Sequence, residues 1–328
     1  MPDFLSAHPD SYSKVSSGFV ETLLQSRRAE LFTGLMRLLY PEGDVFLHTF
    51  LGGVQQKLYR CSESGTESIL RPAWMNILGR ENASVFFMTM SVDSLRLMQM
   101  ACEVPILRTD EHILTHQQLT DLVLDWTKRP EPAIVHILGE KRLDNLYLMS
   151  GATNPVIESV SFVDTASSFA INDAFFPSLL PSSDTYRVVR HVSDAEHPIW
   201  QGYELRLAFH PLMRLLINRF SELAGRMLTE RLCERISSWL RDGGLDIKVT
   251  MNGIVNHHFF ESLESSIDAY IGIIRCFHDE ASPAIGLRMA EGLSRDILLK
   301  LEPYRRETLT RHIYNQDHLD TVTGRVWR

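Results

Sequence analysis

The densest group of side chains able to do chemistry lies in the segment Asn256-His257-His258-Phe259-Phe260-Glu261. An imidazole can serve near neutral pH as a general base or as a ligand contact. His278 follows in a later predicted helix, next to two further acidic residues. We therefore name His257, His258, Glu261 and His278 as the candidate ligand-binding residues, on the condition that the fold brings the two segments together.

A second interpretation of these residues is structural. Adjacent residues of an extended segment point to opposite sides, so His257 and His258 would not readily bind one metal ion together. On this interpretation the polar groups cap helix ends and face water, while Phe259 and Phe260 anchor the core. The sequence therefore supports no metal site, no cofactor and no catalytic residue here.

Another histidine pair, His112 and His116, has the four-residue spacing that places two zinc ligands on one face of a helix. A zinc protease also needs a glutamate directly after the first histidine as general base, and this chain has Ile113 there. Thr115 and Gln118 form a capping box, which predicts that a helix starts at Thr115 and leaves His112 outside it. We expect no metal site at this pair.

Several common signatures of function are missing from the sequence. It contains no G-x-x-x-x-G-K-[ST] phosphate loop, no G-x-G-x-x-G, no G-x-S-x-G nucleophile elbow and no C-x-x-C pair. Lys and Arg number 33 against 41 Asp and Glu, a net charge of −8. Nucleic-acid binding depends on clustered positive charge, so we expect no nucleic-acid partner.

The cysteines and the apolar runs indicate the compartment. The four cysteines are widely spaced within apolar segments, which is typical of buried thiols in a reducing environment. The N-terminus lacks the basic and apolar regions of a secretory signal. No run approaches the roughly 18 apolar residues of a membrane span. We therefore expect a cytoplasmic protein that is not associated with membranes.

Length and patterning predict an α+β protein of two domains. The chain has 328 residues, of which 44% are hydrophobic, and a typical domain has roughly 150 residues. We expect a flexible lead-in and a β-rich α+β domain, then a mainly helical α+β domain and a polar tail. The predicted boundaries are 1–17, 18–200, 201–313 and 314–328.

Antiparallel hairpins dominate the predicted first domain. Strands at 30–40, 45–50 and 54–60, separated by short turns, form a meander. Two further hairpins of similar composition are predicted at 77–89 and 137–150, a possible internal repeat. The capping-box helix lies between them. The segment 153–197 is rich in Ser, Asp and Pro and predicts long connections around one or two strands.

The second domain begins with alternating apolar residues at 203–209, which predict a half-buried strand. Pro211 then opens a helix to about residue 241, ended by Gly243-Gly244. A strand at 245–251 closes with an Asn252-Gly253 turn. Helices follow at 262–278 and 282–301.

The predicted 211–241 helix is the candidate interaction element. It carries arginines interleaved with glutamates, a pattern typical of a solvated face with pairs four residues apart. Its near-heptad apolar run covers only two to three heptads, short of the length that indicates a coiled coil. Core packing is therefore favoured, and binding of a protein partner or self-association is the functional alternative.

The stretch from Phe19 to Arg60 resembles a known signalling module. A short helix leads into RRAELFTGLMRLLYPEGDVFLHTFLGGVQQKLYR, which contains a strand, an acidic-Gly turn, a strand, a Gly turn and a third strand. This order resembles the N-terminal domain of PatA-like bacterial response regulators. The resemblance implies a regulatory role without catalytic residues. The sequence shows no receiver domain, so no phosphorylation site is implied.

These patterns favour a cytoplasmic, non-enzymatic regulatory or scaffold protein that acts through protein–protein interaction, and an oligomer is plausible. One alternative is a small-molecule sensor or enzyme with a histidine-containing pocket in the C-terminal half. A second alternative is a structural subunit of a larger assembly, which would expose a large apolar patch.

Overall fold

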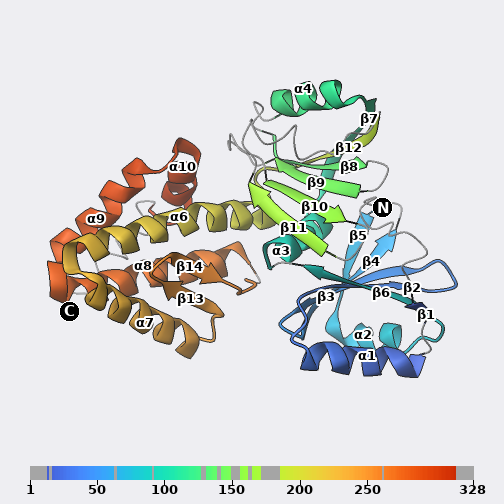
Figure 1. Ribbon diagram of the computed structural model, residues 1–328, viewed down its shortest axis with the longest axis horizontal. Coiled ribbons are helices and arrows are strands. Elements are labelled where there is room, and N and C mark those ends of the chain that lie inside the picture. Colours follow the sequence, from blue (N-terminus) through green and yellow to red (C-terminus); the bar gives the residue numbers. More distant parts are fainter. Residues whose placement is uncertain are drawn as a thin grey trace. The chain divides into compact units, whose positions relative to one another are not determined.

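A computed structural model shows an α+β protein (Figure 1). The chain divides into two compact units, Met1–His197 and Pro198–Arg328, which we describe separately. The structure describes residues 13–14, 17–62, 65–90, 92–126, 131–138, 142–148, 156–161, 165–170, 185–260 and 262–314. Most of the predicted lead-in, most of the predicted tail and much of 153–184 therefore lie outside the described residues.

The first unit is built on a mostly antiparallel sheet. Its strands lie in the order β5-β4-β3-β2-β6-β11-β10-β9-β8-β12-β7, and β1 pairs with β6. Strands β6 and β11 pair in parallel. The strands are β1 Ser13–Lys14, β2 Gly34–Leu39, β3 Val45–Leu51, β4 Val54–Ser62, β5 Gly65–Ile69, β6 Ser84–Met90, β7 Ile106–Leu114, β8 Ala133–Leu138, β9 Arg142–Leu148, β10 Val156–Ser161, β11 Thr165–Ala170 and β12 Tyr186–Ser193.

Helices cover this sheet and complete its cores. They are α1 Ser17–Ala29, α2 Arg71–Leu78, α3 Val92–Glu103 and α4 His116–Trp126. α1 and α2 lie on one side of the β2–β4 strands (Figure 1), where Trp74 of α2 joins Phe46 and Phe50 in one apolar cluster. α4 contributes Leu119, Val123 and Trp126 to a separate cluster with β8 and β12.

The predicted antiparallel meander is present as β2, β3 and β4. Gly34 pairs with Phe50 and Leu39 with Val45 across the first turn. The predicted first strand is shorter than expected, because α1 continues to Ala29 and β2 begins only at Gly34. At the second turn Gly53 has a φ of 79°, and a Cβ there would lie 2.6 Å from the Arg28 carbonyl oxygen. Only glycine fits that position.

The predicted hairpin at 77–89 is wrong in its first half. Residues 71–78 form α2, with Pro72 in the first turn, where its missing N–H costs nothing. The following strand β6 pairs with β2 rather than with this segment. The second predicted hairpin is confirmed as β8 and β9, with Ala133 opposite Leu148 and Leu138 opposite Leu143. The two segments are therefore not copies of one hairpin.

The capping box of α4 is confirmed. The Thr115 N–H donates to the Gln118 side-chain oxygen at 3.0 Å, and the Gln118 N–H donates to the Thr115 hydroxyl at 3.4 Å. The two contacts satisfy donors that the first turn would otherwise leave open. His116 is the first residue of the helix, and His112 lies in β7.

The second unit is mainly helical. Its long helix α6 packs against α7, α8, α9 and α10, and the two-stranded β13–β14 hairpin lies beside α6 and α7. These elements enclose one large apolar core. Their bounds are α6 Pro198–Ala224, α7 Arg226–Asp242, β13 Ile247–Thr250, β14 Gly253–Asn256, α8 Leu263–Ile285, α9 Leu287–Lys300 and α10 Pro303–His312.

The strand predicted at 203–209 is instead part of α6, and this prediction is wrong. Leu205, Phe209 and Leu212 are fully buried at spacings of four and three, which is the period of a helix. The short run fits alternation equally well, so it does not distinguish the two structures. Pro211 lies inside α6 rather than at its start. Its missing N–H leaves the carbonyl of Leu207 without the usual helical bond.

The predicted single helix over 211–241 is also wrong, because Gly225 divides it into α6 and α7. Gly225 has a φ of 85°, a conformation that side-chain-bearing residues rarely adopt. The apolar spacing of four and three continues across the break, so the sequence pattern does not reveal it. The expected end at Gly243-Gly244 is confirmed, with Gly244 at a φ of 74°.

The predicted break between the last two long helices lies too early in the chain. α8 continues through Pro283 to Ile285, and the break falls at Gly286, which has a φ of 82°. The start of α8 agrees with the prediction, since Ser262 and Ser265 form a capping box. The predicted hairpin turn before it is present between β13 and β14.

Candidate functional site

His257 and His258 lie directly after β14 and contact the start of the same hairpin. The His257 N–H donates to the Asp246 carbonyl at 2.9 Å. The His258 N–H donates to the Asn256 side-chain oxygen at 3.0 Å, and the His258 ring lies 4.8 Å from that of Phe260. These contacts join His257 and His258 to the two ends of the hairpin, at Asp246 and Asn256. Glu261 lies outside the described residues.

His278 lies elsewhere in the second unit. It is about 22 Å along α8 from the helix's first residue, by the rise of 1.5 Å per residue. Its Nε2 lies 2.7 Å from the Ser294 hydroxyl of α9. Burial lowers the pKa of His278, and nearby Arg295 lowers it further, while Glu291 raises it. His278 and the His257–His258 pair thus have different neighbours, and the described residues contain no group of three metal-ligating side chains.

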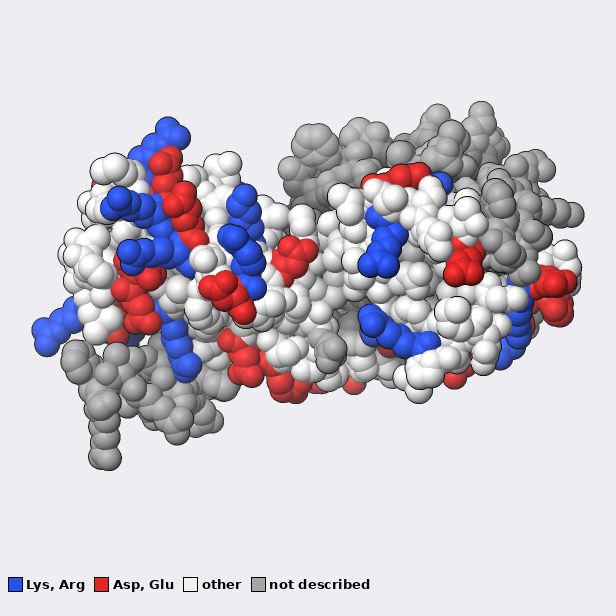
Figure 2. Space-filling view, turned by 90° about the horizontal axis from the view of Figure 1, so that it is seen from below, with Lys and Arg blue, Asp and Glu red and all other residues white. Residues whose placement is uncertain are grey.

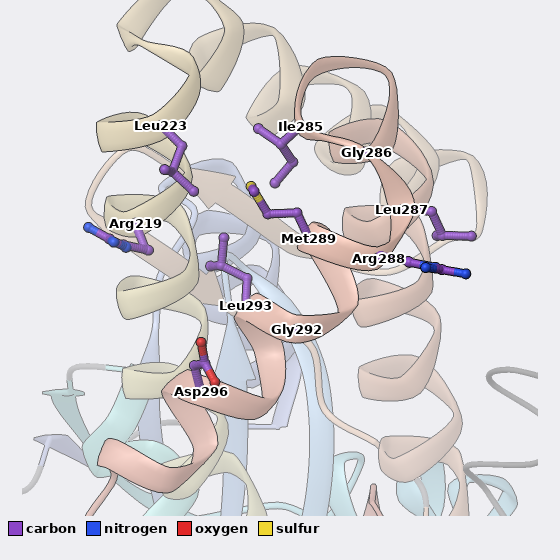
Figure 3. Close-up of a pocket in the computed structure, with 10 residues that line it drawn as sticks. All are labelled: Arg219, Leu223, Ile285, Gly286, Leu287, Arg288, Met289, Gly292, Leu293 and Asp296. Atoms are coloured by element: carbon purple, nitrogen blue, oxygen red, sulfur yellow. The ribbon is translucent and has the colours of Figure 1, made fainter.

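An open groove lies between α6 and α9 in the second unit (Figure 3). Its volume is about 950 Å³. We call it the α6–α9 groove. The residues lining it are Arg219, Leu223, Ile285, Gly286, Leu287, Arg288, Met289, Gly292, Leu293 and Asp296. They come from one face of α6, the end of α8 and one face of α9, so segments more than sixty residues apart in sequence form its walls.

The floor and walls of the groove are apolar. Side chains of Leu223, Ile285, Met289 and Leu293 point toward the same space in Figure 3. Leu223 is 43% exposed and Met289 is 52% exposed. Met227, in the first turn of α7, is also exposed. Side chains of this size are usually buried in a folded domain, so their exposure together marks a surface available to a ligand or partner.

Glycines open this groove. Gly286 breaks the chain between α8 and α9, so that Ile285 ends one wall and Leu287 begins the next. A Cβ at Gly286 or at Gly292 would meet no atom within 4 Å. The groove therefore reaches the backbone at both positions, where another chain can approach closely.

Charged residues stand at the rim of the groove. Arg219 forms an ion pair with Glu222 on the same helix. Arg288 and Asp296 belong to α9, and no described residue forms an ion pair with Arg288. On the face shown in Figure 2, Lys and Arg of the second unit are interspersed with Asp and Glu. The rim thus supplies single charges rather than a basic patch.

The residues of this groove carry no distinguishing pattern in the sequence. Leu223 and Met289 look like ordinary apolar positions of helices in the sequence. Gly225 and Gly286 were the available signals, because a glycine inside a helical pattern costs stability and often marks a break. Which side chains face each other across such breaks depends on how the helices pack.

Comparisons with known proteins do not assign a family. No family model and no curated protein sequence matches the chain. Among solved structures, the chain is similar to the DNA polymerase beta subunit of Streptococcus pyogenes at 9% identity and a TM-score of 0.13, covering 61% of this chain and 74% of that one. The DNA polymerase III subunit beta from Pseudomonas aeruginosa gives 8% identity, a TM-score of 0.13 and coverage of 62% and 74%. Likenesses this weak carry no argument about fold or function.

One exclusion concerns membranes. In the parts of the chain that the structure describes, no helix combines the length and the apolar composition that a bilayer span requires.

Proposed function

We propose that the chain is a cytoplasmic, non-enzymatic regulatory or scaffold protein that binds a helix of a protein partner in the α6–α9 groove. The observation that carries this proposal is the exposure of Leu223 and Met289 on facing walls of one apolar groove. An amphipathic helix fills such a groove with side chains at positions i, i+3, i+4 and i+7.

Burial of the groove residues supplies the driving force. Covering a large apolar side chain completely stabilises a complex by about 1.5–3 kcal/mol. Leu223 is 43% exposed and Met289 is 52% exposed, so a bound helix would cover apolar area on both walls of the groove. Leu and Met together also form an adaptable surface, since Met is unbranched and polarisable.

The rim charges favour one chemistry in the partner. Arg288 is one of the lining residues and has no ion-pair partner among the described residues, and in Figure 3 its side chain extends outward from α9 at the rim of the groove. A partner helix with an acidic residue next to its apolar stripe would pair with Arg288 and fix the register. Asp296, further along α9, would disfavour an acidic residue at the other end.

The cysteines support a cytoplasmic location. All four are free thiols, and Cys61, Cys102 and Cys233 are buried. Burial raises the pKa of Cys233 to about 11, so its thiol stays protonated and unreactive at neutral pH. Together with the resemblance of residues 19–60 to PatA-like response regulators, this supports a role in intracellular signalling.

The test places a photo-crosslinking amino acid in the groove. Introduced at Met289 or Leu223 in the full chain, p-benzoylphenylalanine should give the same crosslinked protein in cells. The same residue at Met75, which is 72% exposed on α2, is the matched control and should not give that product. The crosslinked segment of the partner, made as a peptide, is then titrated against the purified chain.

The variants Leu223→Lys and Met289→Lys should weaken that peptide's binding at least tenfold, about 1.4 kcal/mol. As exposed substitutions they should change the free energy of unfolding by no more than about 0.5 kcal/mol. The proposal is contradicted if the groove positions give no crosslinked product, or only the products that the Met75 position gives. A crosslink to a second copy of the chain would replace the partner helix with self-association.

A further inference from the structure

Strand β7 lies at one end of the sheet of the first unit. It pairs with β12 along Ile106–Leu114, and no described strand lies on its other side. With nine residues it is longer than β5, the five-residue strand at the opposite end of the sheet. Alternate residues of an edge strand direct their backbone N–H and C=O groups outward, so β7 presents a row of unpaired hydrogen-bonding groups.

The side chains of β7 are unusually exposed for a strand of this length. Leu107 is 67% exposed and Ile113 is 75% exposed, and Ile106 is exposed as well. Proteins usually protect a sheet edge by shortening it or by placing charges and prolines on it. β7 does carry charges at its centre, but both of its ends are apolar.

We propose that this edge is an interface with a second copy of the chain, in which β7 pairs antiparallel with β7 about a two-fold axis. Centred on Asp110, the pairing places Leu107 opposite Ile113 of the second copy at both ends of the strand. Thr109, whose hydroxyl lies 3.0 Å from the Nδ1 of His191 in its own chain, then lies opposite Glu111 of the second copy, so an uncharged polar residue meets the carboxylate. The strand is therefore complementary to itself.

Other registers do not give this match. In a continuous sheet, residues directly opposite each other share a face, so one strand can slip past the other only in steps of two residues. Each such step moves the centre of the pairing by one residue. Centring the pairing on Glu111 would oppose two glutamates and place Ile113 opposite Thr109. Centring it on Thr109 would place Leu107 opposite Glu111. Only the pairing centred on Asp110 buries both exposed apolar residues against each other.

The charge at the centre is already compensated within each copy. Asp110 would meet Asp110 of the second copy, and like charges directly opposite are unfavourable. Each Asp110 carboxylate, however, lies 3.3 Å from the Arg108 guanidinium and 3.5 Å from that of Arg190. Glu111, on the other face, pairs with Arg187 at 2.7 Å. These arginines reduce the repulsion that the pairing would otherwise create.

A charge-swap experiment tests the register directly. The full-length double variant Leu107→Lys/Ile113→Lys places lysine opposite lysine at both ends of the interface. The variant Leu107→Lys/Ile113→Glu places lysine opposite glutamate instead. Sedimentation equilibrium should show that the wild type is a dimer and that the lysine pair raises the dissociation constant of the dimer at least tenfold. The charge swap should restore dimerisation at low salt, and high salt should abolish this recovery.

Two controls separate this interface from others. Leu70→Lys changes a residue that is 80% exposed outside β7 and should leave the dimer intact. Leu223→Lys/Met289→Lys, in the α6–α9 groove, should also leave it intact, so failure of one proposal does not imply failure of the other. A wild-type chain that is still monomeric at a concentration of about 100 μM overturns the proposal, because its dimer would then have a dissociation constant above that concentration. So does a lysine pair that dimerises normally, or a charge swap that does not recover.

Discussion

Each unit buries a histidine, and the two units do so differently. In the first unit, His48 of β3 has no exposed surface, and its ring lies 4.7 Å from Phe50 and 5.0 Å from Trp74. Neither ring nitrogen has a hydrogen-bond partner among the described residues. In the second unit, His278 is 8% exposed, and its Nε2 lies within hydrogen-bonding distance of the Ser294 hydroxyl.

The comparison shows what a hydrogen bond changes for a buried polar ring. Burial lowers the pKa of His48 to about 3, with no charged group opposing it. Burial also lowers the pKa of His278, but Glu291 opposes that shift. A buried polar group without a partner loses its hydrogen bonds to water, and no hydrogen bond within the protein replaces them. We therefore expect His48 to cost the first unit stability and His278 to cost the second unit little.

The largest expected effect is on acid stability. The pKa of His48 is about 3 when folded and 6.5 in the unfolded chain, so below pH 6.5 the unfolded state binds a proton that the folded state does not. Stability is therefore greatest above pH 6.5 and falls toward pH 3, by about 3 kcal/mol between pH 7 and pH 4. Urea unfolding of the wild type and of His48→Leu at both pH values measures this difference.

Hydrogen exchange assigns that loss to a unit. Acidification should deprotect peptides from β3 in the wild type but not in His48→Leu, while peptides from α8 should respond alike in both proteins. An equal loss of protection in both proteins would show that other groups cause the acid sensitivity. Such a result would contradict the expectation that His48, and not His278, makes the protein sensitive to acid.

A smaller effect is expected at neutral pH. His48→Leu replaces an unpaired imidazole with an apolar side chain and should raise the free energy of unfolding by about 1–2 kcal/mol. Met36→Leu, at the position opposite His48 on β2, is a matched control for core substitution and should be neutral or mildly destabilising. Destabilisation by His48→Leu would indicate that the ring has a partner in solution, such as a buried water.

The smallest effect concerns the paired histidine. Ser294→Ala removes the partner of His278 and should destabilise the second unit by about 1 kcal/mol. In the double variant His278→Leu/Ser294→Ala both polar groups are gone, so the loss should be less than the sum of the two single losses. Additive losses in urea unfolding would mean that the 2.7 Å contact contributes nothing, and that the two buried rings are energetically alike.

Two segments with similar sequences show where a sequence pattern fails to predict secondary structure. Both 71–79 and 131–139 begin with a proline-containing pair and end in Ile-Leu-Gly, and the sequence predicts that each Ile-Leu-Gly end, at 77–79 and 137–139, begins a hairpin. The second contains Ile134, Val135 and Ile137 and forms β8, whereas the first has Ile77 as its sole β-branched residue and forms α2. β-branched residues favour strands, so this difference was present in the sequence and the shared ending concealed it.

The candidate site was less accessible to sequence analysis than the fold. His257, His258 and His278 stand out in the sequence because each lies beside other ionisable residues. His48 lies alone within a predicted strand, so the sequence does not distinguish it. The groove residues and the exposed ends of β7 look like ordinary apolar positions in the sequence, because exposure depends on which elements cover them.

The sequence by itself determined the features that depend on neighbours a few residues away. These are the capping boxes at Thr115 and Ser262, the turn at Gly53 and the end of α7 at Gly244. Each follows from one residue's backbone preference or from one short hydrogen bond. No distant part of the chain is needed to specify them.

Only the tertiary structure decided the remaining features. Apolar runs such as 203–209 fit either a helix or a strand, and the long-range packing of α6 in the core selected the helix. The same packing left Leu223 and Met289 uncovered, placed β7 at the end of the sheet and buried His48 without a partner. Burial is a property of the whole assembly of elements, because each side chain is covered by residues that lie far from it in the sequence.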